Sequence, residues 1–191
     1  MPKTPDHPNI IAFTGSHGTG KTTSVYDYAA KAKKTHAGNV GILMEVARIC
    51  DQPVLNRDGQ LPTEDAQRWI FSRQWNDEET LSHRYDWLIS DRTIVDCIAY
   101  TVFGGHVTLA DALMDMARHL MHRYHMIIFK PICANDYCTQ DGFRSTNRKI
   151  RQRIEDILIN LYDELGTQLI MDSYNPKPMT PTWAKPCVCH P

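Results

Sequence analysis

The sequence has no apolar run near the roughly 18–20 residues that a membrane-spanning helix needs. Its first nine residues, MPKTPDHPN, also lack the apolar core of a secretory signal, so we expect a cytoplasmic protein with no membrane partner. Neither sign of charge is in excess, because 21 Lys and Arg residues face 22 Asp and Glu residues, giving a formal net charge of −1. This balance argues against a general nucleic-acid coat protein, which would be broadly basic.

The chain is long and apolar enough to build one sizeable core, with 191 residues of which 42% are hydrophobic and 23% charged. We expect one folded domain over residues 1–172. The tail at 173–191 holds five prolines and no helical or strand pattern, so it should wrap the surface or stay disordered.

A glycine-rich stretch near the N-terminus carries the strongest chemical signal. The apolar run IIAF at 10–13 is typical of a strand buried on both faces, and the Ala- and Lys-rich segment 24–34 indicates a helix. Between them, GSHGTGKT fits the phosphate-binding pattern G-x-x-x-x-G-K-[ST]. Glycines let successive N–H groups point at one anion, and the helix start adds more N–H groups and a positive dipole end. The pattern predicts a nucleoside triphosphate site formed by Gly15, Ser16, His17, Gly18, Thr19, Gly20, Lys21, Thr22 and Thr23.

Two residues of this loop have chemical roles of their own. Lys21 is expected to bring a full positive charge to the transferred phosphate, and the Thr22 hydroxyl to ligate Mg²⁺.

An apolar strand that ends in Asp is the second metal-organising element of phosphate-loop proteins. The apolar segment at 86–90 ends in this way, so Asp91 is the second expected Mg²⁺ ligand.

The apolar run VGILM at 40–44 is also followed by charged side chains, Glu45 and Arg48. Because parallel sheets bind ligands outside the carboxyl ends of their strands, these side chains should point toward the nucleotide. Glu45 is the first candidate to accept the proton of an acceptor hydroxyl, and Asp91 is its rival. Alternatively, Glu45 only pairs with Arg48 or with an arginine of a lid that closes over the phosphates.

Other residues are expected to face the second substrate. Arg48 and Arg92 should face the acceptor or the phosphates. Gln74 lies on a helix expected from Thr63 to about His83, and it could form a wall for a flat substrate.

Strands alternate with helices along the chain, which indicates a parallel α/β sheet.

A basic run precedes the last helix. Five cations come before its first acid, Glu155, although a helix placed only for stability would carry acids in its first turn. We expect the arginines to lie opposite the apolar face and to meet an anion, and a solvated charged face is the alternative. The run consists of Arg144, Arg148, Lys149, Arg151 and Arg153.

These motifs together resemble nucleoside and nucleotide kinases of the phosphate-loop superfamily, in particular the branch of the ribosylnicotinamide kinase domain and its phage and bacterial relatives. The resemblance spans residues 10–171 and rests on the loop at 15–22, EVAR at 45–48, Asp91-Arg92-Thr93 with Ala99-Tyr100 one helix later, and DGFR at 141–144. Thymidylate kinases carry a similar Asp-Arg followed by Ala-Tyr. Deoxynucleoside kinases carry a Glu at the end of the second strand, where it is the general base.

The resemblance implies an α/β fold, a three-layer P-loop NTPase sandwich with a five-stranded parallel sheet of order 2-3-1-4-5. It also implies an arginine lid at about 132–149, with Arg144 and Arg148 closing over the phosphates. We therefore expect Mg²⁺-dependent transfer of the ATP γ-phosphate to a nucleoside, nucleotide or similar small molecule. Two alternatives remain: a kinase acting on a nucleic-acid hydroxyl, at a polynucleotide 5′ end or a modified base, and a nucleotide-dependent ATPase or switch without an acceptor.

Overall fold

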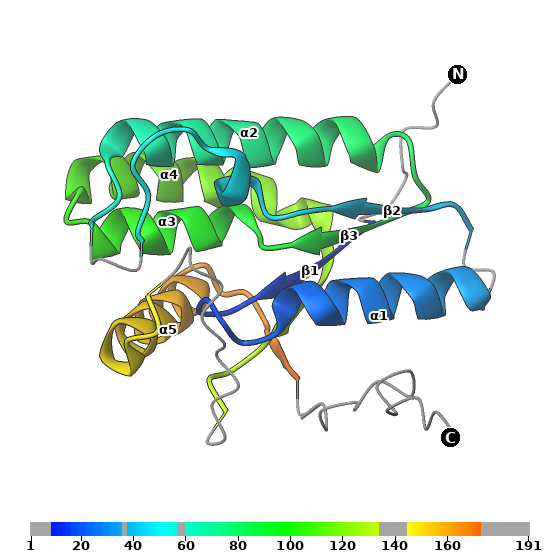
Figure 1. The fold of residues 1–191 in the computed structure, drawn as a ribbon. Helices are drawn as coiled ribbons and strands as arrows, with labels where there is room; N and C mark the ends of the chain where they lie inside the picture. The colour runs from blue at the N-terminus through cyan, green and yellow to red at the C-terminus, as the bar shows by residue number, and fades with distance from the viewer. Residues whose placement is uncertain (1–8, 36–37, 57–59, 134–144, 173–191) are drawn as a thin grey trace, which may run out of the picture.

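Five parallel strands form one sheet with helices on both faces (Figure 1). The computed structural model describes residues 9–35, 38–56, 60–133 and 145–172. The strands lie in the order β2-β3-β1-β4-β5, which confirms the predicted α/β class and strand order. They are β1 (Ile10–Thr14), β2 (Val40–Leu43), β3 (Trp87–Asp91), β4 (Tyr124–Phe129) and β5 (Ile170–Met171).

The helix expected from Thr63 to about His83 is α2, which has Thr63 as its N-cap and ends at Ser82. Helix α1 begins at Lys21 rather than near residue 24, because Gly20 in the left-handed conformation is its N-cap. A single 3₁₀ turn lies between α4 and β4. The helices are α1 (Lys21–Lys34), α2 (Glu64–Ser82), α3 (Ile94–Phe103), α4 (Val107–Leu120) and α5 (Arg148–Glu164), and the 3₁₀ turns are η1 (Val46–Ile49) and η2 (Met121–Arg123).

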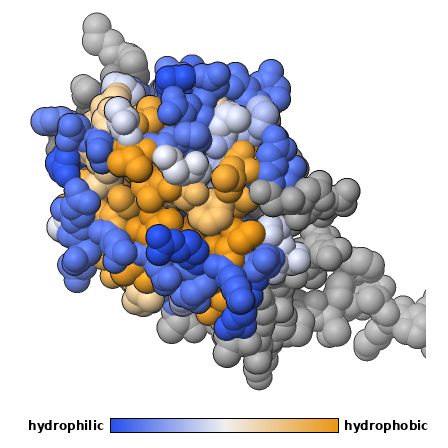
Figure 2. Space-filling view, turned by 90° about the vertical axis from the view of Figure 1, so that its left-hand side faces the viewer, coloured by the Kyte–Doolittle hydropathy of each residue, from blue (hydrophilic) through white to orange (hydrophobic). Residues whose placement is uncertain are grey.

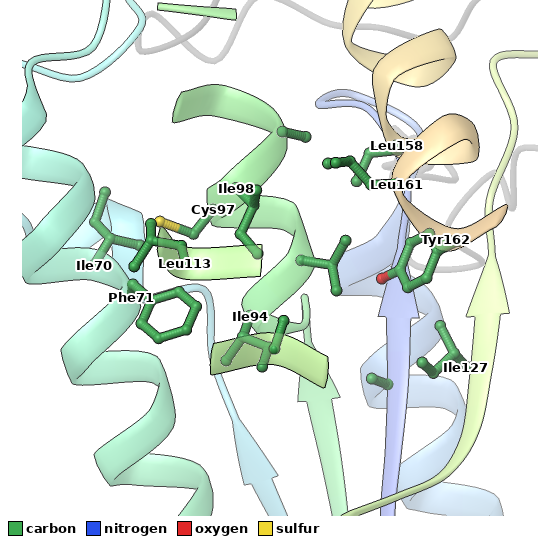
Figure 3. Close-up of a cluster of buried hydrophobic side chains, with 14 of the residues drawn as sticks. Ile70, Phe71, Ile94, Cys97, Ile98, Leu113, Ile127, Leu158, Leu161 and Tyr162 are labelled. Atoms are coloured by element: carbon green, nitrogen blue, oxygen red, sulfur yellow. The ribbon is translucent and has the colours of Figure 1, made fainter. Parts of the chain in front are cut away.

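The central strand β1 divides the core into two clusters because its side chains alternate between the two faces of the sheet. Ile11 and Phe13 pack in the smaller cluster with Val25 and Ala29 of α1. Ile10 and Ala12 belong to the larger cluster, to which α2, α3, α4 and α5 contribute. Figure 3 shows part of it, where apolar side chains of α2, α3 and α5 meet. Burial on both faces accounts for the unbroken apolar run of β1.

Several predicted segments fall partly or wholly outside the described residues. The predicted lid at 132–149 is described only at 132–133 and 145–149, and Arg144 and the tail at 173–191 lie outside the described part. Among the described helices, none has the length and apolar character that crossing a membrane requires.

Candidate active site

The carboxyl ends of β1, β3 and β4 lie level with one another. Phe13 pairs with Asp91 across β1 and β3, and Thr14 pairs with Phe129 across β1 and β4. The ladder continues one residue further, since the Arg92 and Lys130 amides donate to the carbonyls of Phe13 and Thr14 at 2.9 Å each. The residues that follow each strand therefore converge around the start of the glycine-rich loop, as expected for a parallel sheet.

The glycine-rich loop leaves β1 at Gly15, where only glycine fits. Its φ is +140°, and a β-carbon there would lie 2.4 Å from the carbonyl oxygen of Lys130. Gly18 and Gly20 also have positive φ values, 72° and 82°. The loop ends directly on the first turn of α1, so the unpaired N–H groups and positive dipole end of that helix face the loop.

Lys21 is held inside this loop. Its side chain is buried, and Nζ donates to the carbonyl of Ser16 at 2.6 Å. Thr19 donates to the same carbonyl at 3.0 Å. Among the described residues, the buried Ser16 hydroxyl has no hydrogen-bond partner, so the loop contains an unpaired polar atom next to a cation. A phosphate oxygen fits such a site, because buried donors need acceptors. Thr23, the last residue of the predicted set, is exposed on the first turn of α1.

Thr22 and Asp91 lie side by side at the junction of α1 and β3. The Thr22 hydroxyl donates to Asp91 Oδ2 at 2.5 Å. The other oxygen, Asp91 Oδ1, is buried and has no hydrogen-bond partner in the part of the chain that the structure describes. A hydroxyl oxygen and a carboxylate oxygen without a partner are the hard oxygen ligands that Mg²⁺ prefers, so the two residues fit the predicted metal.

Arg92 forms the centre of a buried ion-pair cluster. Its Nε donates to Glu45 Oε1 at 2.7 Å, and its Nη1 donates to Asp96 Oδ1 at 2.9 Å. Glu45 is the N-cap of η1 after β2, and Asp96 lies in the first turn of α3. The triad Glu45–Arg92–Asp96 therefore joins three segments of the chain. Glu45 pairs with Arg48 too, Nε to Oε2 at 3.1 Å, as the ion-pair alternative describes.

The backbone and the charge state of Arg92 are both unusual. Arg92 has a φ of +92°, the one non-glycine residue in the described chain with a positive value. Such strain is held by surrounding contacts: the Arg92 carbonyl accepts from the Ser90 hydroxyl at 2.7 Å and from Gln74 at 3.4 Å. Burial would lower the pKa of Arg92, but its interactions with Tyr100, Asp96 and Asp91 raise it above its usual value. The guanidinium thus stays charged.

Gln74 is buried at this site, but its amide nitrogen already has protein partners. It donates to Glu78 Oε1 at 2.8 Å and to the Ser90 hydroxyl at 3.2 Å, besides the Arg92 carbonyl. Its contacts therefore support the strained turn at Arg92. The predicted role of Gln74 as a substrate wall stays a prediction.

His17 connects the loop to two other segments. Its Nε2 lies 2.8 Å from the carbonyl of Ser145, so that nitrogen carries the proton, and its Nδ1 lies 3.0 Å from the Tyr100 hydroxyl. Burial raises the pKa of Tyr100, which keeps the phenol neutral. The Tyr100 hydroxyl also accepts from Arg92 Nη2 at 3.4 Å. A chain of hydrogen bonds therefore runs from Arg92 to the residues just before α5.

Arg151 corrects the expectation that the cations before Glu155 lie opposite the apolar face. Its side chain is buried, and its Nε donates to the carbonyl of His17 at 2.9 Å. A second donation, from Nη2, reaches the carbonyl of Gly18 at 3.4 Å. Arg151 thus binds the outer side of the loop backbone. Arg148 is exposed at the first residue of α5.

A pocket opens beside the loop, and His17, Glu45, Arg92, Asp96 and Tyr100 contribute to its wall. The rest of its lining is mostly apolar or neutral: Val46, Ala47, Val54, Leu55, Gln67, Ile70, Gln74, Thr93 and Cys97. Figure 2 looks onto the face where the strands end and shows apolar side chains gathered in its middle, with polar ones around them. Burial raises the pKa of Cys97 to about 12, so its thiol is not a nucleophile.

Sequence reasoning missed Asp96, and it placed Arg151 on the wrong side of its helix. A signal for Asp96 was present, because Thr93 and Asp96 have the spacing of a capping box, and the Thr93 amide does donate to Asp96 Oδ2 at 2.9 Å. For Arg151 the signal was helical periodicity. Residues seven and eleven positions later, Leu158 and Tyr162, share its side of the helix, and both are buried.

A complete phosphate-binding loop between a central strand and a helix, with an aspartate ending the neighbouring strand, defines a P-loop nucleotide-binding protein of the nucleotide-kinase-like type. The chain belongs to the AAA domain family, whose model matches residues 10–176. A comparison with curated proteins finds no match.

Solved structures show the same fold. A thymidylate kinase from Ehrlichia chaffeensis is similar with a TM-score of 0.56 and 16% identity, over 90% of this chain and 92% of that one. A thymidylate kinase from Candida albicans is similar with a TM-score of 0.60 and 12% identity, over 86% of this chain and 84% of that one. At these identities the likeness shows the P-loop kinase fold.

Proposed function

We propose that this chain transfers the γ-phosphoryl group of ATP, with Mg²⁺, to a small molecule that is a nucleoside, a nucleotide or a similar compound. The observation that carries the proposal is the position of the pocket. It shares His17 with the phosphate loop, and Glu45 and Arg92 line it. A donor and an acceptor can therefore be held against each other, which is most of what phosphoryl transfer requires of a protein.

The loop binds the donor. Lys21, which sits against the Ser16 carbonyl, moves toward the β- and γ-phosphate oxygens and neutralises the charge that shifts during transfer. Thr22 and Asp91 would hold Mg²⁺, which would supply positive charge against the negative charge of the phosphates. Arg144 and Arg148 remain proposed lid residues that cover the phosphates and exclude water.

The pocket binds the acceptor. Glu45 accepts the proton of an acceptor hydroxyl, and Arg48 and Arg92 hold the Glu45 carboxylate in position. Glu45 fits the role of base better than Asp91, because Glu45 lines the pocket whereas Asp91 contacts Thr22. The thymidylate kinases with this fold act on a small molecule, as their name says, and this supports a small acceptor for the present chain as well.

The test measures ADP formation with Mg²⁺ and ATP against nucleosides, nucleotides and short DNA and RNA. We expect a small molecule to stimulate turnover strongly. We expect Lys21→Ala to lower this turnover by roughly 100- to 1000-fold, because a contact made most strongly in the transition state is worth several kcal/mol. Lys33→Ala, on the exposed last turn of the same helix, is the matched control and should leave turnover unchanged.

The other outcomes point to other functions. Stimulation by DNA or RNA alone would favour a nucleic-acid kinase. Turnover that responds to no acceptor would favour an ATPase or switch. Normal stimulated turnover in Lys21→Ala would refute the role of the loop.

A further inference from the structure

We infer that the acceptor is electrically neutral and offers a hydroxyl group, as a nucleoside does, and that it is not a phosphate-bearing nucleotide. This inference rests on the proposed function and narrows it. It comes from the charges of the acceptor pocket, where the cation that faces the acceptor is already neutralised by protein carboxylates.

The charge of Arg92 is fully matched within the protein. Two carboxylates, Glu45 and Asp96, contact its guanidinium at 2.7 and 2.9 Å, and its third nitrogen reaches the Tyr100 hydroxyl at 3.4 Å. The side chains of Arg92, Glu45 and Asp96 are 9%, 2% and 1% exposed. With one cation and two anions, the buried triad carries a formal charge of −1. It offers no positive field to an incoming anion.

The carboxylates are themselves firmly held. Asp96 Oδ2 accepts from the Thr14 hydroxyl at 2.8 Å and from the Thr93 amide at 2.9 Å. Withdrawing Asp96 from Arg92 would break this capping arrangement at the start of α3. Asp96 is therefore a fixed counter-ion of Arg92.

The other described cations near the pocket also have assigned contacts. Arg48, with a side chain 43% exposed, pairs with the same Glu45. Lys130 pairs with Asp172 at 2.6 Å, and Arg151 donates to loop carbonyls. The ion-pair network of Arg48, Arg92, Glu45 and Asp96 thus has two cations and two anions and no net charge.

A phosphate on the acceptor would meet a second obstacle. Phosphoryl transfer places the reacting end of the acceptor beside the γ-phosphate, which is already negative. Bringing a dianion next to it, beside a buried ion-pair network with no net positive charge, costs desolvation and repulsion. An uncharged molecule avoids both costs, and the apolar wall of Val46, Val54, Leu55 and Ile70 favours such a molecule.

Phosphoryl transfer to a hydroxyl acceptor is balanced in bonds and charges. The hydroxyl oxygen forms a bond to the γ-phosphorus, the bond from that phosphorus to the β–γ bridging oxygen breaks, and ADP leaves with the electron pair. The hydroxyl proton passes to the Glu45 carboxylate. Arg92 remains paired with Asp96 after Glu45 is protonated, so the step leaves no unpaired buried charge.

The first test uses matched pairs of acceptors, each nucleoside against its own 5′-monophosphate, with Mg²⁺-ATP and the whole chain. We expect at least one nucleoside to give a kcat/KM at least roughly tenfold above that of its monophosphate. Phosphorylation of monophosphates alone would overturn the inference and leave the proposed function standing. If no acceptor of either kind stimulates turnover, both fail.

The second test measures binding rather than turnover, because Glu45 is also the proposed base. Glu45→Gln removes one negative charge from Arg92, so the variant should bind the 5′-monophosphate at least several-fold more tightly than the wild type in the presence of a non-hydrolysable ATP analogue. Nucleoside affinity should change little. Asp115→Asn breaks a surface pair with Arg118 and serves as the control. Equal monophosphate affinity in wild type and Glu45→Gln would contradict the neutralisation argument.

Discussion

Arg92 has both a structural and a chemical role at this site. Arg92 is strained at φ +92°, yet it holds two carboxylates that come from different segments. A strained backbone persists only where its surroundings fix it, and here Ser90 and Gln74 hold the carbonyl while Glu45 and Asp96 hold the side chain. The strain therefore places the guanidinium at the pocket, where an unstrained turn would direct it elsewhere.

The pairing of Thr22 with Asp91 gives a prediction about the metal. Asp91→Asn should lower stimulated turnover by at least roughly 100-fold, because an amide oxygen is a much weaker ligand for Mg²⁺ than a carboxylate. The Mg²⁺ concentration for half-maximal turnover should rise, while binding of the acceptor stays unchanged. The measurement is a Mg²⁺ titration of initial rates.

Asp86 at the other end of β3 provides the matched control. It is exposed and accepts from the Asn39 amide at 2.8 Å, so Asp86→Asn removes a carboxylate without touching the site. Unchanged Mg²⁺ dependence in Asp91→Asn would refute its role as a metal residue. If that variant lost turnover with no change in Mg²⁺ dependence, Asp91 would replace Glu45 as the proposed base.

At the scale of elements, the phosphate loop depends on α5, which lies far from it in the sequence. His17 contacts Ser145 just before α5, and Arg151 on α5 contacts the His17 and Gly18 carbonyls. The loop is therefore fixed from both sides, by its own strand and helix and by α5. Because the predicted lid leads directly into α5, these contacts also connect the loop with the end of the lid segment.

Arg151→Met should weaken binding of Mg²⁺-ATP by roughly tenfold or more. Methionine keeps an apolar stem but removes donors to two carbonyls, and hydrogen bonds from a charged group are worth about 1.5–3 kcal/mol each. The measurement is the ATP dissociation constant by calorimetry, together with the melting temperature. Arg153→Met, exposed on the same helix, should change neither. An unaltered ATP dissociation constant in Arg151→Met would show that the contact only stabilises the fold.

At the scale of the whole molecule, the parts that local sequence determines were predictable. The strand, loop and helix over residues 10–34 followed from one motif and its flanks, and the strand order followed from the resemblance and is confirmed. The partners of Arg92 were not predictable, since Glu45 and Asp96 reach it only after β2 and β3 pair and α3 packs. Contacts between distant segments depend on tertiary packing, which composition and spacing do not encode.

A buried carboxyl behind the site makes the stability of the whole domain depend on pH. Glu78 on α2 is fully buried, and it contacts Arg123 at 2.7 Å and the Tyr124 hydroxyl at 2.7 Å. Burial raises its pKa from 4.5 to about 7, against the opposing charge of Arg123. Its contribution to stability is therefore fully present below pH 4.5, where both states hold the proton, and is lost as the pH rises to about 7.

The expected loss is up to about 3 kcal/mol in the free energy of unfolding, at about 1.4 kcal/mol per pKa unit. Glu78→Gln removes the titrating group. The wild type should therefore lose more stability than this variant between about pH 5 and about pH 8, the range in which Glu78 titrates. Urea denaturation at a series of pH values measures the difference. Glu164→Gln, an exposed carboxylate paired with Arg118, is the control and should keep the wild-type slope. Parallel pH profiles for wild type and Glu78→Gln would mean that Glu78 stays ionised in the folded protein, held by Arg123.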